Sequence, residues 1–217
     1  GSLCLDISRR AVTHENQCET WFRSVNPQGK IPALSISQTG QVLWESQVIL
    51  QFLEDSHVAL GGEGRALVPL APLDRAHMRL VVATHDLYLA SPNCTQPGAF
   101  THTQGCMYVP PPHSKHVTTR WIDRPTRAAK LRECWKQLDV LESLCRGPFF
   151  CGDDVSLADL TVFPTVIFFL FFTPRVFGWE DGAVFHGRPR LKYWFEEGMI
   201  ALPAARRVHD EVTTALL

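Results

Sequence analysis

The chain has 217 residues, of which 45% are hydrophobic and 20% are charged, and its formal net charge is −1 with a sequence pI near 6.8. This balance is ordinary for a globular protein, and the length is sufficient for one large domain or two modest ones. Because the chain carries no excess of basic residues, nucleic acid is not an expected partner.

The cysteines point to a reducing compartment. Seven of them are scattered along the chain at positions 4, 18, 94, 106, 134, 145 and 151, without a C-x-x-C pair. An odd number with loose spacing favours free thiols over a disulfide framework. Since no signal-peptide pattern opens the chain, we expect a cytoplasmic protein.

The first part of the chain alternates short strand and helix signals. Leu3–Ile7 is a strand candidate, and the polar stretch 8–19 leads to a short helical turn near Trp21. A strand is expected over 31–36, a hairpin turn at 39–41 and a returning strand over 42–44. A helix then opens at Ser46, with apolar residues at helical spacing: Ile49, Leu50, Phe52 and Leu53.

The rest of the chain is helical or irregular. Gly and Pro residues mark 61–72 as a linker, and helices are expected over 73–90, 126–145 and 156–172, with shorter peripheral ones over 189–199 and 204–217. The stretch 91–125 is rich in Pro, Thr, His and Gly and is expected to be a long irregular insertion. The predicted layout is an α+β unit over 3–60 followed by an all-α unit over 73–217.

The most apolar run, Leu160 to Phe172, is 13 residues long and contains Pro164. It is too short to cross a bilayer, so it predicts a buried core helix, and we expect no membrane partner.

The segment Asn26–Ser46 carries the most specific chemistry. An Ile31-Pro32 bond before a strand favours a cis peptide, which would leave the Ile31 N–H and C=O open to an extended peptide ligand. Ser46, at a helix N-terminus, favours a carboxylate, and Glu45 beside it can take an ammonium group. Lys30 could reach a second carboxylate. Together these parts describe a ligand with an α-amino acid head, a peptide middle and a terminal carboxylate, which is the form of glutathione.

Each of these residues also has a structural interpretation. Ser46 is typical of a plain helix N-cap, Lys30 of a solvated lysine, and Pro32 of a trans turn proline. Only the order and the spacing of the three favour the functional interpretation.

The block N-P-Q-G-K-I-P-A-L followed by W-E-S resembles the thioredoxin-like domain of cytosolic glutathione transferases, and F-F-C-G-D-D-V-S-L-A-D-L-T-V-F-P over 149–164 resembles the helical-domain motif of that family. The second motif is also similar to that of the rho class. The resemblance implies that Glu45 and Ser46 bind the γ-glutamyl head, that Ile31 before Pro32 holds the cysteinyl unit, and that Lys30 faces the glycine carboxylate, with His14 near that end.

In the second motif, Ser156 and Asp159 have the spacing of a structural capping box. The cysteines and histidines of the insertion, Cys94, His102, Cys106, His113 and His116, match no zinc-site spacing. We therefore expect no metal.

The resemblance also places the catalytic residue ahead of Leu3. In the family, a strand and a helix precede the corresponding segment, and the junction between them carries the Tyr, Ser or Cys that contacts the glutathione sulfur. Three interpretations compete: a truncated chain, a front segment that is not represented, and a protein that lost catalysis and rebuilt the domain. Tyr88, His85 and Arg79 lie on the helix that lines the substrate side in the family and are weaker candidates.

The resemblance thus implies a glutathione transferase that activates the thiol of glutathione for attack on a small hydrophobic electrophile, as a homodimer. Two alternatives remain open. One is a redox enzyme of the same fold, of the thiol-transferase or dehydroascorbate reductase type. The other is a non-catalytic interaction module with a vestigial pocket.

Overall fold

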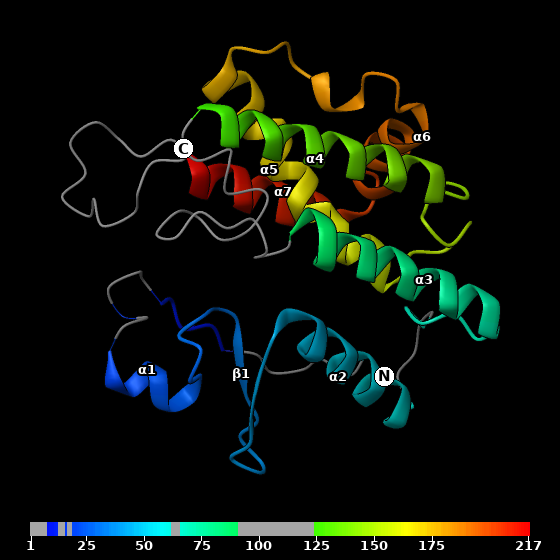
Figure 1. The fold of residues 1–217 in the computed structure, drawn as a ribbon. Helices are drawn as coiled ribbons and strands as arrows, with labels where there is room; N and C mark the ends of the chain where they lie inside the picture. Colours follow the sequence, from blue (N-terminus) through cyan, green and yellow to red (C-terminus); the bar gives the residue numbers. More distant parts are fainter. Residues whose placement is uncertain (1–7, 13–15, 17–18, 62–65, 91–123) are drawn as a thin grey trace. The chain divides into compact units, whose positions relative to one another are not determined.

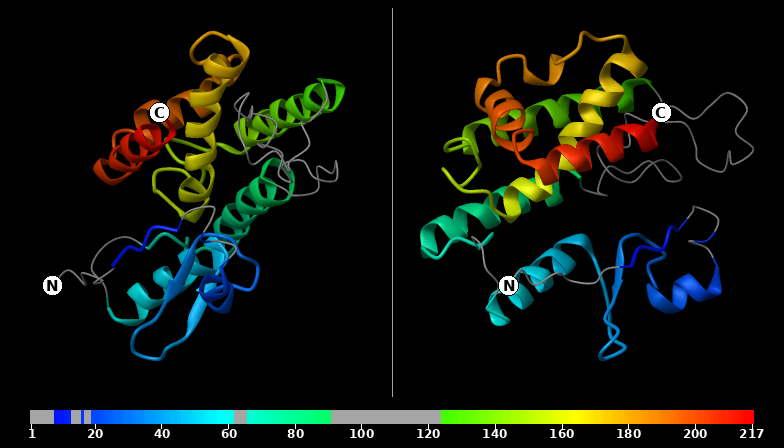
Figure 2. Two further views of the ribbon diagram at one scale, coloured as in Figure 1. Left: turned by 90° about the vertical axis from the view of Figure 1, so that its left-hand side faces the viewer. Right: turned by 180° about the vertical axis from the view of Figure 1, so that it is seen from behind.

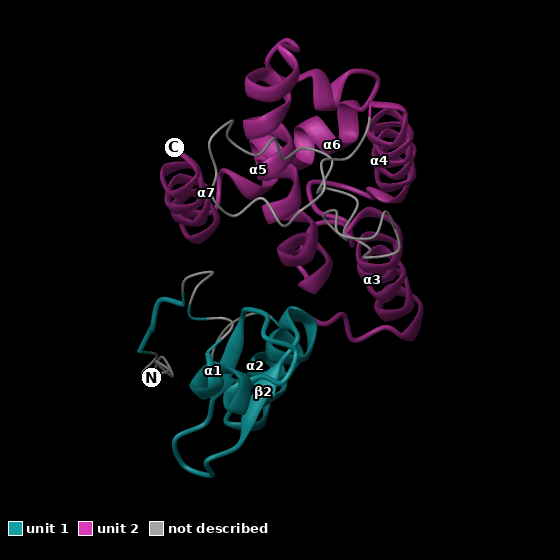
Figure 3. Ribbon diagram, turned by 60° about the vertical axis from the view of Figure 1, so that its left-hand side comes forward, with its two compact units in different colours: residues 1–67 teal, residues 68–217 magenta. Residues whose placement is uncertain are grey.

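The structure is a computed structural model that describes residues 8–12, 16, 19–61, 66–90 and 124–217. The chain divides into two compact units, residues 1–67 and residues 68–217 (Figure 3). This division lies within the segment 61–72 that is expected as a linker. The strand expected at Leu3–Ile7 lies outside the described residues.

The first unit is built around a β-hairpin. In the described residues it contains α1 (Thr20–Val25), β1 (Ala33–Ser35), β2 (Val42–Trp44) and α2 (Ser46–Ala59). The strands are antiparallel, and Ala33 pairs with Trp44 while Ser35 pairs with Val42. Strand β1 is shorter than the predicted range 31–36. Because Pro32 has no N–H to donate to a ladder, pairing begins after it.

Local hydrogen bonds close the hairpin and the end of the unit. The Gly40 N–H donates to the Ile36 carbonyl at 2.8 Å, and Gly40 has a φ of 71°, a conformation that favours glycine. After α2, the buried Glu54 carboxylate accepts a hydrogen bond from the Leu67 N–H at 2.7 Å. This bond ties the end of the unit to its longest helix.

The second unit is helical throughout its described part. Its elements are α3 (Pro72–Thr84), which continues as the π-helical turn η2 (His85–Leu89), then α4 (Arg124–Leu144), α5 (Leu157–Phe177), the 3₁₀ turn η4 (Ala183–Phe185), α6 (Pro189–Tyr193), the π-helical turn η5 (Trp194–Met199) and α7 (Pro203–Leu216). Helix α5 runs through the middle of the unit, with α3 and α4 on one side and α7 on the other (Figures 1 and 2).

Helix α5 (Leu157–Phe177) is longer than the helix predicted over 156–172. It has 21 residues and ends at Gly178, whose φ of 65° stops the helix. Among the described residues it is the one helix with the length and composition to cross a membrane. Half of its most apolar 18-residue stretch is buried inside the unit, as in the core helix of a globular domain. The buried residues include Val162, Val166 and Phe169.

Two other expectations need correction. The irregular insertion does not extend to residue 125, because α4 begins at Arg124 and Pro125 is tolerated in a first helical turn. The remainder of the insertion lies outside the described residues. The segment 189–199 is not peripheral either, since Leu191, Trp194 and Met199 are each at most 1% exposed.

Candidate functional site

The end of the β-hairpin brings together four of the sequence-predicted binding residues, Ile31, Pro32, Glu45 and Ser46. The Ile31-Pro32 peptide is cis, and Ile31 is 55% exposed. Since Ala33 pairs with Trp44, continuing the register past this pair brings Ile31 and Pro32 to the same end of the hairpin as Glu45 and Ser46. In the described part of the chain, no hydrogen bond occupies the main-chain N–H or C=O of Ile31. An extended peptide could therefore pair with it.

Ser46 is the first residue of α2, a 14-residue helix, and both Glu45 and Ser46 are exposed. The first N–H groups of a helix have no partner within it, and the helix dipole attracts negative charge there. A ligand carboxylate is therefore favoured at Ser46. The Glu45 carboxylate beside it supplies the opposite preference, for an ammonium group.

Glu45 has an unusual backbone conformation. Its φ is 71° and its ψ is 117°, and among the described residues it is the one residue other than glycine with positive φ. Such a conformation costs free energy and persists where the surroundings or a function require it. The residue type carries no signal for this feature, because glutamate shows no preference for positive φ.

Lys30 is exposed and directly precedes Ile31. Its carbonyl accepts a hydrogen bond from the side-chain amide of Asn26 at 2.6 Å. Asn26 is buried, with an exposed fraction of 1%. The sequence indicated a turn at Asn26-Pro27 but gave Asn26 no part in the site. His14, predicted near this end of the ligand, lies outside the described residues.

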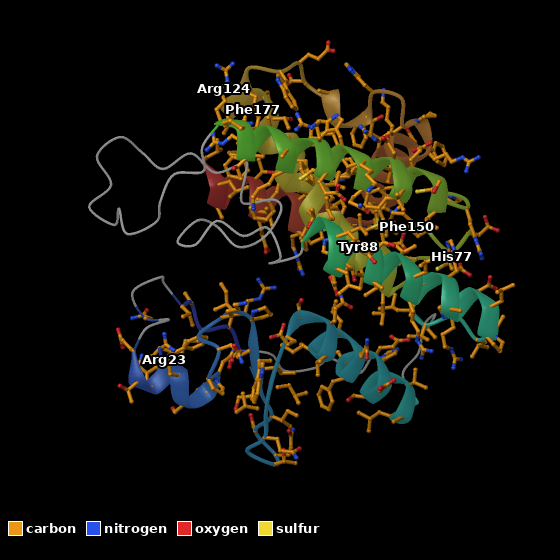
Figure 4. The ribbon with its side chains drawn as sticks, in the orientation of Figure 1. Arg23, His77, Tyr88, Arg124, Phe150 and Phe177 are labelled. Atoms are coloured by element: carbon orange, nitrogen blue, oxygen red, sulfur yellow. The ribbon has the colours of Figure 1, made fainter. Side chains whose placement is uncertain are left out.

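The helical unit holds the weaker catalytic candidates. The His85 ring contacts Asp86 Oδ1 through Nδ1 and Thr165 Oγ1 through Nε2, each at 2.8 Å, so both ring nitrogens are engaged. His85 is buried, whereas Arg79 and Tyr88 are exposed. Figure 4 shows Tyr88 toward the C-terminal end of the helix formed by α3 and η2. These contacts indicate a structural role for His85.

The capping box at the start of α5 is present. Asp159 accepts hydrogen bonds from the Ser156 N–H at 2.7 Å and from the Ser156 hydroxyl at 2.8 Å. It also accepts from the Phe150 N–H at 2.9 Å and from Trp194 Nε1 at 2.8 Å. Asp159 is 0% exposed. The residue therefore joins α5 to the preceding loop and to η5, and it has no opening to a ligand.

His77 makes a second link of this kind. Its Nε2 lies 3.0 Å from the Leu144 carbonyl oxygen and 3.1 Å from that of Phe150, near which it is seen in Figure 4. Because both contacts are to carbonyls, Nε2 carries the proton. Within the described residues, no group of three or more His, Cys, Asp or Glu side chains is placed to hold a metal ion.

Two family models match the chain. The model of the glutathione S-transferase N-terminal domain matches residues 9–56, and that of the C-terminal domain matches residues 120–197. Together they span more than half of the sequence, in the order that the two units follow.

Curated relatives and a solved structure agree with these matches. Probable maleylacetoacetate isomerase 1 of Drosophila melanogaster is 27% identical over 165 residues, covering 76% of this chain and 55% of the relative. Protein LigF of Sphingobium sp. strain SYK-6 is 39% identical over 72 residues, 33% of this chain and 26% of that protein. The chain thus spans about half the length, or less, of these two relatives.

The crystal structure of maleylacetoacetate isomerase from Methylobacterium extorquens AM1, with bound malonate and GSH, is 28% identical. It superposes with a TM-score of 0.59 and covers 89% of this chain and 79% of that one. The fold is accordingly a thioredoxin-like N-terminal domain followed by an all-helical C-terminal domain. On the two domain matches and this likeness, the chain belongs to the glutathione S-transferase family.

Proposed function

We propose that the protein binds glutathione at the end of the β-hairpin and acts as a glutathione transferase on a small hydrophobic electrophile. The observation that carries the proposal is the placement of the open Ile31 main chain, cis Pro32 and the Glu45-Ser46 start of α2 at one end of the hairpin. These groups complement the peptide middle and the α-amino acid head of glutathione. Lys30 would face the glycine carboxylate, and His14 is assigned to the same end from the family resemblance.

The reaction would join the glutathione sulfur to an electrophilic carbon. The thiol loses its proton, the sulfur forms a C–S bond, and the leaving group departs with the bonding electrons. Holding both reactants in one site and stabilising the thiolate supply the rate enhancement. The family resemblance assigns the Tyr, Ser or Cys that contacts the sulfur to a position outside the residues described here.

Glutathione-dependent isomerisation is the second candidate. It is favoured by the similarity to maleylacetoacetate isomerases, at 27% identity for the fly protein and 28% for the bacterial structure that holds glutathione. In an isomerisation, glutathione is present at the start and at the end. This distinguishes it from conjugation, which consumes one glutathione for each product, and from thiol transfer, which yields oxidised glutathione.

Product analysis separates these reactions. The protein is incubated with glutathione and one of three substrates in parallel: an activated aryl halide, maleylacetoacetate or dehydroascorbate. Thiol, disulfide, thioether and the isomer of maleylacetoacetate are quantified. Thioether formation above the protein-free rate, reduced in Ser46→Ala, supports the transferase. Isomer at constant thiol supports the isomerase instead, and disulfide supports the redox alternative. A chain that binds glutathione and accelerates none of the three would contradict the enzyme proposal and favour an interaction module.

We also propose a cytoplasmic homodimer that binds neither nucleic acid nor membranes. The dimer is proposed from the family resemblance. The near-neutral net charge supports the proposal that nucleic acid is not a partner. Sedimentation equilibrium gives the mass of the assembly directly. Twice the chain mass of 24.4 kDa is the expected result, and the chain mass alone would contradict it.

A further inference from the structure

The loop that precedes Ile31 is organised by one buried side chain. The Asn26 side-chain amide donates to the Lys30 carbonyl at 2.6 Å, and its Oδ1 accepts from the Gln28 N–H at 3.0 Å. The Asn26 main chain is engaged as well: its N–H donates to the Phe22 carbonyl at 2.8 Å, and its carbonyl accepts from the Gly29 N–H at 2.9 Å. Four hydrogen bonds of Asn26 thus close the loop 26–30 onto the end of α1.

The bond to the Lys30 carbonyl has a consequence one residue further along. The Lys30 C=O and the Ile31 N–H belong to the same planar peptide unit, which is trans and in which they point in opposite directions. Fixing the carbonyl therefore fixes the direction of the N–H. Lys30 and Ile31 are both exposed, so little packing from their own side chains holds this peptide in place.

We propose that Asn26 is a positioning residue for glutathione, which holds the Lys30–Ile31 peptide in the orientation that lets the Ile31 main chain pair with the ligand. The inference rests on the proposed glutathione site. Asn26 itself is 1% exposed and does not meet the ligand; it acts through the peptide plane.

The chemistry of the side chain explains why asparagine is required. The two bonds need an acceptor and a donor on one short side chain, and the asparagine amide supplies both. Aspartate is of nearly equal size but at neutral pH only accepts, so Asn26→Asp keeps the bond from Gln28 and loses the bond to Lys30. Asn26→Ser likewise keeps an acceptor and cannot reach the Lys30 carbonyl.

The test titrates glutathione calorimetrically into the 217-residue chain and into Asn26→Asp, with Asn26→Ser used where the aspartate variant does not fold. Loss of one hydrogen bond that orients a binding group predicts about tenfold weaker binding. Ser24→Ala is the matched control, because it removes one side-chain hydrogen bond from α1, to the Trp21 carbonyl at 2.7 Å, without touching the loop. Its affinity should equal that of the wild type.

A second measurement tests the loop without any ligand. Amide hydrogen exchange and the nitrogen-15 shift of Ile31 are recorded in the glutathione-free proteins, and both should change in Asn26→Asp but not in Ser24→Ala. Wild-type binding together with unchanged affinity in the Asn26 variants would overturn the inference and leave the glutathione site standing. A folded wild type that does not bind glutathione would overturn the site, and this inference with it.

Discussion

At the scale of single residues, the backbone of Glu45 is where stability and binding are expected to oppose one another. Its φ of 71° is unfavourable for a residue that has a Cβ atom, and such backbone strain costs of order 1–3 kcal/mol. The conformation lies at the start of α2, between the strand that ends at Trp44 and the helix N-terminus at Ser46. A residue that carries both a strained backbone and a proposed ligand contact is a place where function can outweigh stability.

We therefore expect Glu45→Gly to raise the free energy of unfolding by about 1 kcal/mol. Glycine adopts positive φ readily, which relieves the strain, but its greater conformational freedom in the unfolded chain offsets part of the gain. The same variant should bind glutathione more weakly, since the carboxylate is lost. Glu45→Gln is the matched control: it removes the charge and keeps the strain. Urea denaturation of both variants checks the claim, and equal stability of the two would contradict it.

The cysteines of the helical unit are a second residue-scale case. Cys145 is 3% exposed, and burial, with the nearby Glu142 carboxylate as a second cause, raises the pKa of its thiol from 9.0 to about 12. Burial also raises the pKa of the less deeply placed Cys151. Since the thiolate is the reactive form, neither is a nucleophile near neutral pH, and Cys145 is the less reactive of the two.

Iodoacetamide at pH 8 should consequently leave Cys145 unmodified in the folded protein and alkylate it in urea, as read by peptide mass mapping. The pKa is raised in the folded state, so the native protein retains a proton that the unfolded chain gives up. The contribution of Cys145 to stability is thus complete below about pH 9 and is lost as the pH rises toward 12. Rapid alkylation of native Cys145 at pH 8 would show that the site is open.

At the scale of elements, the N-terminus of α5 is held by a single carboxylate. Asp159 receives hydrogen bonds from Phe150, Ser156 and Trp194, which belong to the preceding loop, the cap residue and η5. Burial raises the pKa of this carboxyl, and the donated hydrogen bonds oppose the shift. The preceding loop, the cap residue and η5, which lies 35 residues further along the chain, therefore depend on one buried side chain.

Asp159→Ala should destabilise the protein by about 3 kcal/mol, because it leaves several buried donors without an acceptor. Asp153→Ala, at an exposed position of the same loop, is the control and should remain within about 0.5 kcal/mol of the wild type. Urea unfolding followed by tryptophan fluorescence measures both. A loss below 1 kcal/mol for Asp159→Ala would mean that the segments are held by packing alone.

The elements also show how far sequence patterns reach. The hairpin and α2 follow from turn residues and local periodicity, which lie within a few residues of one another. Helix α5 continues to Phe177, beyond the predicted end at Phe172, and both Pro164 and Pro174 lie inside it, so residue type alone does not mark its end. The burial of Trp194 depends on contacts with Phe150 and Asp159, more than 30 residues away, and periodicity within one segment cannot reveal such contacts.

The candidate site, like the fold, could be predicted from the sequence only in part. Lys30, Ile31, Pro32, Glu45 and Ser46 were named from residue type and spacing, and the hairpin register places Ile31 and Pro32 at the same end as Glu45 and Ser46. The buried Asn26 and the strained Glu45 backbone depend on atomic contacts and dihedral angles, which residue type does not encode. The assignment of His14 stays a prediction.

At the scale of the whole molecule, the two units differ in how much they bury. The buried residues described in the first unit are Phe22, Asn26 and Glu54, whereas those of the second include most of α5 and parts of α4 and η5. Local opening requires less free energy where few apolar contacts are lost. The unit that carries the proposed glutathione site is therefore expected to be the less protected one.

Native-state amide exchange should show the slowest amides in α5, and amides in β1 and β2 that exchange at least about 30-fold faster, which corresponds to roughly 2 kcal/mol. Glutathione should slow the exchange of the hairpin, because a ligand stabilises the state that binds it. Equal protection of the hairpin and α5 in the absence of glutathione would contradict this account and indicate one cooperative structure.

The most direct test of the central claim is calorimetric titration of glutathione into the 217-residue chain, beside Ser46→Ala and the control Ser24→Ala. A hydrogen bond to a charged carboxylate at the start of α2 predicts that Ser46→Ala binds at least about tenfold more weakly, and that Ser24→Ala binds like the wild type. A folded chain that does not bind glutathione, or Ser46→Ala with unchanged affinity, would contradict the placement of the site at the end of the hairpin.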